Sequence, residues 1–140
     1  MTFHEQLARA TAVDRDYLLA APVIQRCLAG DVTRETYVAF LTQAYHHVRH
    51  TVPLLMAVGA RLPDRHRWLQ PAVLHYLEEE AGHDEWILND IAQAGGDRAA
   101  AAASEPSIAT EAMIAYAYDS VTRRNPLGFF GMVHVLEGTS

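Results

Sequence analysis

The spacing of the apolar residues is the feature that most constrains how this chain folds. From Phe3 onward, leucine, alanine and charged residues recur at steps of three and four, and the alternating β-branched runs typical of strands are missing. Prolines and glycines divide this pattern into segments. The sequence therefore predicts an all-α fold, with helices at about 2–20, 22–29, 34–61, 64–94, 107–124 and 126–140.

Several residues predict irregularities within and between these helices. Pro53 lies inside the third segment, where it has no N–H for a helical hydrogen bond, so we expect a kink there. The pair Gly95–Gly96 is expected to end the fourth helix. Residues 97–106 are interpreted as a connection with an alanine run, and Ser107 or Thr110 is expected to cap the helix that follows.

Length and composition indicate a single soluble domain and exclude several classes of protein. A chain of 140 residues, half of them hydrophobic, is long enough to bury one core, so we predict one domain over residues 1–140. The net charge of -6, with 11 scattered basic residues, argues against nucleic acid as a partner. The single Cys27 cannot form an internal disulfide, and no signal segment opens the chain, so we expect a cytoplasmic protein. No apolar stretch is long enough to cross a bilayer, and no membrane partner is expected.

Acidic residues occupy the face of the fourth predicted helix that should pack inward. On a helical wheel, Glu80 and Asp84 fall inside the apolar stripe, and His83 lies at its edge. The stripe itself consists of Val73, Leu77, Ile87 and Ile91. A buried carboxylate without a partner costs on the order of several kcal/mol, so Glu80 requires a cation, a hydrogen-bond network or a raised pKa.

The last predicted helix repeats this anomaly. Leu127, Phe130 and Val133 set an apolar stripe, and His134 and Glu137 fall within it. Helical bundles build iron and manganese sites from carboxylates and imidazoles that converge from facing helices, often with a Glu-x-x-His pattern on one of them. Glu80-Ala81-Gly82-His83 has that form. The pattern alone is weak evidence, because short patterns arise by chance, and the second inward carboxylate strengthens it.

Four stretches, taken in order, resemble a known family. They are Tyr45–Pro53, Tyr76–Trp86, Asn125–Gly128 and Val135–Gly138. Together they resemble the haem-oxygenase-like iron-containing redox enzymes, also called haem-oxygenase-like diiron oxidases. The resemblance implies a helical bundle in which one core helix supplies a Glu and a His, a second supplies a Glu, and a third supplies His and Asp ligands.

Carried over by position, the resemblance identifies Glu80, His83 and Glu137 as metal ligands. No residue after Ser140 is present to supply the third helix, so we expect a haem-oxygenase-like bundle that lacks its C-terminal helices. The implied function is that of a non-haem iron, O₂-dependent oxidase or oxygenase that acts on a small organic substrate. The implied cofactor is Fe(II), with two irons in a complete site and Mn as an alternative metal.

The resemblance leaves the catalytic residues and the substrate unassigned. It implies a diiron oxidoreductase if the chain continues beyond Ser140. We also expect a homodimer, because a bundle without its last helices would expose a large apolar face.

Further side chains are candidates for the surroundings of the metal. Asp84 and His134 are candidates to orient the ligands, and Asp84 could itself become a ligand in a complete site. Phe130 is a candidate for an apolar shell around the site. Tyr76 is interpreted as a core residue with a satisfied hydroxyl, although it could also line the pocket. His47 is either a pocket residue or a hydrogen-bonded core histidine.

Two alternatives to the iron enzyme remain open. In the first, the chain is a metal-free binding protein of the same fold, similar to thiaminase-like or cofactor-synthesis relatives, and Glu80 and Glu137 only form hydrogen bonds. In the second, it is a helical interaction module that recruits a partner without metal. His46 and His50 are four residues apart and could chelate a metal, but we favour a surface pair.

Overall fold

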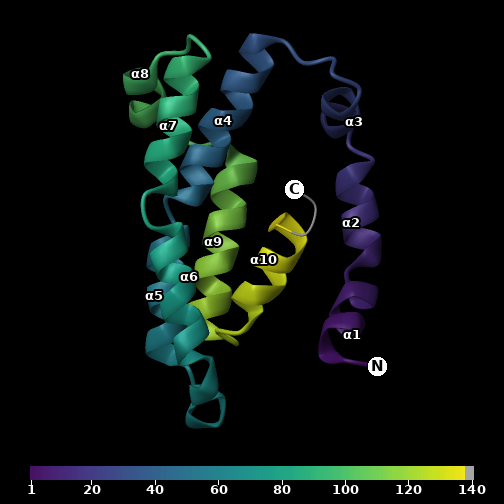
Figure 1. Cartoon of the computed structure of the whole chain (residues 1–140), viewed down its shortest axis with the longest axis vertical. Helices are drawn as coiled ribbons and strands as arrows, with labels where there is room; N and C mark the ends of the chain where they lie inside the picture. Colours follow the sequence, from purple (N-terminus) through teal and green to yellow (C-terminus); the bar gives the residue numbers. More distant parts are fainter. Residues whose placement is uncertain (138–140) are drawn as a thin grey trace. The chain divides into compact units, whose positions relative to one another are not determined.

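The computed structural model describes residues 1–137, apart from the side chain of Glu137. All regular structure within these residues is helical (Figure 1). The elements are α1 (Phe3–Ala10), α2 (Ala12–Leu19), α3 (Pro22–Leu28), α4 (Arg34–Val48), α5 (Thr51–Arg61), the 3₁₀ helix η1 (Asp64–Leu69), α6 (Gln70–Glu80), α7 (His83–Gln93), α8 (Arg98–Ala103), α9 (Ile108–Arg123) and α10 (Gly128–Glu137). This confirms the prediction of an all-α chain. No described helix is both long and apolar enough to cross a membrane.

The chain divides into two compact units, and each is described by itself. Unit 1 comprises Met1–Thr33 and Phe130–Ser140, and unit 2 comprises Arg34–Phe129. That all 140 residues form one domain stays a prediction.

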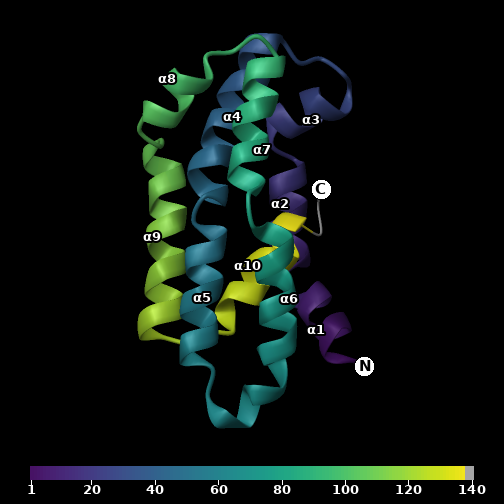
Figure 2. The ribbon, with the colours of Figure 1, turned by 60° about the vertical axis from the view of Figure 1, so that its left-hand side comes forward.

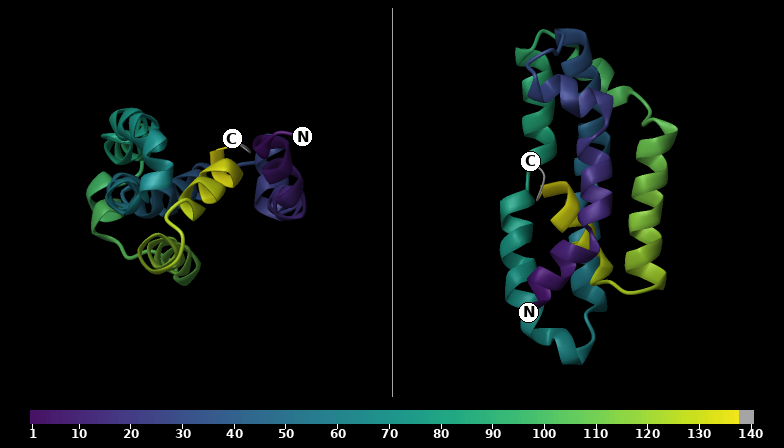
Figure 3. Two further views of the ribbon diagram at one scale, coloured as in Figure 1. Left: turned by 90° about the horizontal axis from the view of Figure 1, so that it is seen from below. Right: turned by 90° about the vertical axis from the view of Figure 1, so that its right-hand side faces the viewer.

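Unit 2 is built from two interrupted helical rods and a third helix beside them. The rod of α4 and α5 runs antiparallel to the rod of α6 and α7, and α9 packs against both α4 and α5 (Figures 1 and 2). The short α8 packs against α7 and α4. Figure 3 (left) shows the helices of this unit close to end on. The buried apolar side chains include Leu41, Leu54, Leu55, Val58, Val73, Leu88, Ile91, Ile114 and Val121.

The first rod is interrupted at Arg49–His50 and not at the proline that the sequence singled out. α4 ends at Val48 and α5 begins at Thr51, so the predicted continuous helix 34–61 is two helices. Pro53 is the third residue of α5, where a backbone N–H has no helical acceptor in any case. The expected kink at Pro53 is therefore wrong in position, because proline is tolerated in the first turn of a helix.

The second rod is interrupted at Ala81–Gly82. We expected one helix over 64–94, but the structure has η1, α6 and α7 in succession. Gly82 has φ 89°, a left-handed conformation that residues with a Cβ adopt only at a cost. Its carbonyl oxygen accepts a hydrogen bond from the backbone N–H of Trp86 at 3.2 Å, which begins the next helical turn. A tight turn at glycine therefore replaces the expected continuation.

The alanine run that we expected to be a connection forms α8. Asp97 caps this helix by accepting a hydrogen bond from the backbone N–H of Ala100 at 2.9 Å. Alanine has the highest intrinsic helix propensity, so a capped alanine run forms a turn of helix readily. The caps of the next helix agree with expectation, because Ser107 accepts a hydrogen bond from the N–H of Thr110 at the start of α9.

The predicted helix at 126–140 begins two residues late. The Asn125 side chain accepts a hydrogen bond from the N–H of Leu127 at 3.1 Å, so the first residues form a turn and α10 begins at Gly128. The final part of that prediction, 138–140, lies outside the described residues.

Unit 1 contains α1, α2, α3 and the part of α10 that begins at Phe130, and no residue of α1, α2 or α3 is buried. The predicted helix 2–20 is divided at Thr11 into α1 and α2. The Thr11 hydroxyl donates a hydrogen bond to the carbonyl oxygen of Leu7 at 2.9 Å, a side-chain bond that is known to bend helices.

Candidate metal centre

The carboxylate of Glu80 and the imidazole of His83 face each other in unit 2. Oε2 of Glu80 lies 3.3 Å from Nδ1 of His83, and the two side chains are 13% and 30% exposed. The sequence predicted both an inward Glu80 and its proximity to His83, and the structure has both features. Burying a carboxylate to this extent has a cost, which a cation, hydrogen bonds or a raised pKa can offset.

The local backbone explains how the two groups meet. We expected Glu80 and His83 on one uninterrupted helix, but Glu80 is the last residue of α6 and His83 is the first residue of α7. Gly82 permits the sharp turn between them because it adopts a positive φ. The pair is therefore held at a junction between two helices, where both backbone segments are fixed by packing of α6 on α5 and of α7 on α4.

The neighbours of the pair differ in their exposure. The rings of His83 and Trp86 lie 4.4 Å apart between centroids, so the indole restricts the orientation of the imidazole. Asp84 and Tyr76 are half-buried. Glu85 is exposed and forms an ion pair with Arg98.

The other predicted site residues lie on α10, in the part that belongs to unit 1. Phe130 and His134 are half-buried there, and the ring of His134 makes an edge-on contact with that of His4, with centroids 5.4 Å apart. The Nε2 atom of His134 is buried and has no hydrogen-bond partner among the described residues. Glu137 ends α10, but its side chain lies outside the described residues, so its assignment as a ligand stays a prediction.

The donor atoms of the Glu80–His83 pair fit a ferrous ion in chemical type. A carboxylate oxygen and an imidazole nitrogen are the ligands typical of non-haem iron sites. Among the described side chains, no group of three or more His, Cys, Asp or Glu residues is arranged to hold a metal. Two donors are too few to hold a metal ion firmly, so the assignment of Glu80 and His83 as ligands stays a prediction.

A second histidine cluster lies at the break between α4 and α5. His46 is 3% exposed, and its Nε2 lies 2.8 Å from Oγ of Ser104. Ser104 donates its own hydroxyl hydrogen to the carbonyl oxygen of Ala101, so His46 is the donor to Ser104. Nδ1 of His50 lies 3.0 Å from the hydroxyl of Tyr118. The expectation that His46 and His50 form a surface pair is wrong, because each is hydrogen-bonded to another helical segment.

The pKa values of this cluster follow from burial. Burial lowers the pKa of His47 below its ordinary value, and the neighbouring His50 lowers it further. The pKa of His50 is lowered by burial first, then by Arg49 and His46, and is partly raised again by Glu111. Burial also raises the pKa of Tyr118. The lowered pKa values favour the neutral forms of His47 and His50.

The sequence did not indicate the hydrogen-bond partners of His46 and His50. Ser104 and Tyr118 are separated from His46 and His50 by 58 and 68 residues, so no local spacing could indicate them. Only the packing of α8 and α9 on the first rod brings them together.

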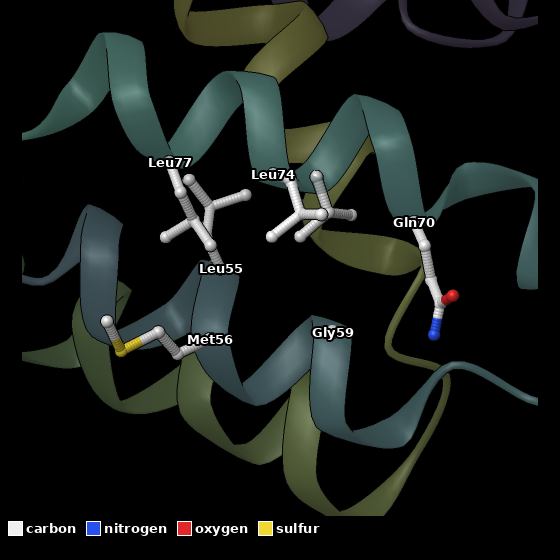
Figure 4. Close-up of a pocket in the computed structure, with 7 residues that line it drawn as sticks. Leu55, Met56, Gly59, Gln70, Leu74 and Leu77 are labelled. Atoms are coloured by element: carbon white, nitrogen blue, oxygen red, sulfur yellow. The ribbon is translucent and has the colours of Figure 1, made fainter.

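A pocket lies between α5 and α6, on the side chains that precede Glu80. Its volume is about 410 Å³, and its lining is apolar except for Gln70. Figure 4 shows Leu74, Leu77 and Gln70 on α6 facing Leu55, Met56 and Gly59 on α5. Leu77 is one helical turn before Glu80, so the apolar lining reaches the neighbourhood of the carboxylate. His47 is not part of this lining.

Comparison with known proteins identifies the family. A family model described as an iron-containing redox enzyme matches residues 38–140. The chain belongs to this family. The match includes Glu80 and His83, and it agrees with the resemblance that the sequence motifs indicated.

The fold is also that of a solved structure. A crystal structure from Shewanella denitrificans OS217, of a domain of unknown function with a heme oxygenase-like fold, is similar with a TM-score of 0.76 and 28% sequence identity. The similarity covers 99% of this chain and 65% of the Shewanella chain, so this chain spans about two thirds of that protein. The described helices therefore have the haem-oxygenase-like arrangement. The search of curated proteins finds no match.

Proposed function

We propose that this chain carries the metal-binding part of a non-haem iron, O₂-dependent oxidase or oxygenase that acts on a small organic substrate. The observation that carries the proposal is the Glu80–His83 pair, with its donor atoms 3.3 Å apart and the carboxylate only 13% exposed. Membership of the iron-containing redox enzyme family supports it.

In this proposal Glu80 and His83 bind ferrous iron, and Glu137 is a further ligand. Two carboxylates and one imidazole would neutralise the charge of a divalent ion, which offsets the cost of burying the carboxylates. Ferrous iron held by these residues would supply electrons for the reduction of dioxygen. A site with two irons needs ligands beyond these three, and Mn(II) shares the same donor preferences.

The surrounding side chains would control access and orientation. Trp86 would restrict the His83 ring through their tilted ring contact, and the half-buried Asp84 is a candidate to orient a ligand. His134 remains a further candidate for that role. The apolar pocket beside Leu77 would keep water away from one side of the centre.

Oxygen consumption tests this function. The chain is loaded anaerobically with ferrous iron, freed of excess metal and exposed to O₂ in an oxygen electrode. We expect uptake of O₂ and an absorption change of the bound iron, both abolished in Glu80→Gln. The matched control is Glu78→Gln, which removes an exposed carboxylate two residues away and should behave as wild type. Uptake that is equal in wild type and Glu80→Gln would contradict the proposal.

The pocket favours a second candidate, a metal-free binding protein for a small apolar ligand. A volume of about 410 Å³ lies within the range of small-molecule sites. This candidate predicts that an apolar fluorescent probe binds in the presence of a chelator and that Leu77→Ala changes its affinity while Glu80→Gln does not. Binding that requires iron would exclude it.

A further inference from the structure

One exposed face runs continuously along η1 and α6 and carries an ordered series of side chains. Trp68 is 72% exposed, and the side chains of His75 and Glu79 are 71% and 58% exposed. The opposite face of α6 packs on α5 through Val73, which is 3% exposed. The residues of this face, which we call the η1–α6 face, are Arg65, Trp68, Pro71, Ala72, His75 and Glu79.

Helical geometry places these residues on one side. Arg65 and Trp68 are three apart in a 3₁₀ helix, in which residues at that spacing eclipse each other. Ala72, His75 and Glu79 follow at steps of three and four along α6, so they share a face. From one end to the other, the face is therefore cationic, aromatic, small and finally acidic.

When two copies of this face are placed antiparallel, each residue type lies opposite a type that it can bind. A two-fold axis brings the same surface of two copies together in opposite directions. Arg65 then meets the partner's Glu79, and Trp68 meets the partner's His75. Pro71 and Ala72 lie near the axis, where small side chains allow two helices to approach closely.

The register of this arrangement agrees with helical rises. With rises of about 2.0 Å per residue in η1 and about 1.5 Å in α6, Arg65 and Glu79 are about 24 Å apart along the axis. Their midpoint falls at Pro71, and Trp68 and His75 lie at about 6 Å on either side of it. A single two-fold axis at Pro71 therefore places Arg65 opposite the partner's Glu79 and Trp68 opposite the partner's His75.

Within the chain, Nε2 of His75 lies 3.3 Å from Oε1 of Glu79, and both side chains stay exposed, whereas Arg65 and Trp68 have fewer contacts. Nε of Arg65 donates a hydrogen bond to His66, and Arg65 has no ion pair with a described carboxylate. Trp86, the other tryptophan, stacks on His83, whereas Trp68 has no ring contact within the described part of the chain. Exposed tryptophan and arginine are the residues most enriched at the energetic centres of interfaces.

We propose that the η1–α6 face pairs with the same face of a second copy of this chain, in an antiparallel, two-fold symmetric dimer. A single helical face on each side is a small interface, so the dissociation constant should be on the order of micromolar or weaker. The proposal is independent of the metal, because neither Glu80 nor His83 belongs to the face. This interface differs from the large apolar face on which the sequence analysis based its expectation of a homodimer.

Charge exchange tests the pairing. Sedimentation velocity is measured over a wide range of protein concentration, in the presence of a chelator, for wild type, Arg65→Glu and Glu79→Arg. We expect wild type to dimerise and each variant alone to remain monomeric, because each places like charges opposite one another. An equimolar mixture of the two variants should dimerise, since both cross-pairs between Arg65→Glu and Glu79→Arg molecules are then of opposite charge.

The mixture separates a lost interface from a damaged fold, because misfolded variants would not regain association. Arg67→Glu is the matched control, since it reverses an exposed arginine in η1 that projects to another side. It should dimerise as wild type does. Trp68→Ala should weaken association about 30-fold, the effect of a typical interface hot spot. A monomeric wild type, variants that still dimerise alone, a mixture that stays monomeric, or an equal loss in Arg67→Glu would each overturn the proposal.

Discussion

The two breaks in the rods of unit 2 make an instructive comparison, because each has at least one histidine in a polar contact. At the α4–α5 break, His46 and His50 are bound to the hydroxyl groups of Ser104 and Tyr118. At the α6–α7 break, His83 faces the carboxylate of Glu80. A hydroxyl group is a suitable hydrogen-bond partner for a neutral imidazole, whereas a carboxylate beside an imidazole is a pair of donor types that can also bind a metal ion.

The comparison separates two roles for histidine in one bundle. The first cluster joins α4 and α5 to α8 and α9, so we assign it to the stability of the fold. The second pair has the donor types of a metal site, so we assign it to function. Substitutions of these histidines and of their contact partners should therefore affect different measurable properties at the two breaks.

The largest expected difference is in iron affinity. Glu80→Gln removes a proposed ligand and should weaken Fe(II) binding by more than about 100-fold, since even partners of ligands contribute 10–100-fold. His46→Gln, at the other break, should leave the affinity unchanged. Competition with a chromophoric chelator under anaerobic conditions measures both. Equal Fe(II) affinities of Glu80→Gln and His46→Gln would contradict the assignment of metal binding to the α6–α7 break alone.

The free energy of unfolding should depend on the hydrogen bond between His46 and Ser104 at the α4–α5 break. Ser104→Ala leaves the buried Nε2–H of His46 without its acceptor, which should lower the free energy of unfolding by about 1–3 kcal/mol. Chemical denaturation of the metal-free chain measures this effect. In the double variant His46→Leu/Ser104→Ala the losses should be smaller than the sum of the single losses, because the two residues form one hydrogen bond. Strict additivity would show that the bond contributes nothing.

The turn at the α6–α7 break should depend on glycine. Gly82→Ala forces a Cβ into the left-handed region and should cost about 1–2 kcal/mol of unfolding free energy, although no atom lies within 4 Å of the new Cβ. Gly131→Ala is the control, since it lies inside α10 and its Cβ also meets nothing within 4 Å. That substitution should stabilise by about 0.5–1 kcal/mol, because alanine favours a helix. A neutral Gly82→Ala would mean that the turn is not constrained.

The smallest expected effect is a dependence on pH at the α4–α5 break. The folded chain lowers the pKa values of His47 and His50 below 6.5, so the unfolded chain binds more protons on them. The free energy of unfolding should therefore fall as the pH decreases below about 6.5. Denaturant midpoints of wild type and of His47→Asn/His50→Asn across this range measure the effect. A slope that persists unchanged in the double variant would assign it to other groups.

Much of the helical architecture could be predicted because it depends on local signals. Ser107 caps α9, and the inward position of Glu80 follows from the periodicity of its neighbours. The stop near Gly95 was also expected, and that residue has φ 81°. Each of these features is determined within about one helical turn of sequence.

The remaining features depend on competition between local preferences or on distant partners. The apolar periodicity of the sequence continues through Ala81–Gly82, so it did not predict that α6 ends before this turn. We predicted a kink at Pro53, yet proline fits the first turn of α5 and the helix is interrupted earlier, at Arg49–His50. The burial of His46 requires Ser104, which only the packing of α8 supplies.

The central claim is that Glu80 and His83 bind iron, and X-ray absorption at the iron edge tests it most directly. The chain is loaded anaerobically with ferrous iron, and its spectrum is compared with those of His83→Ala and His50→Ala. We predict a nitrogen and oxygen environment with an imidazole contribution that disappears in His83→Ala and persists in His50→Ala. Failure of wild type to bind iron, or an imidazole contribution that remains in His83→Ala, would contradict the account.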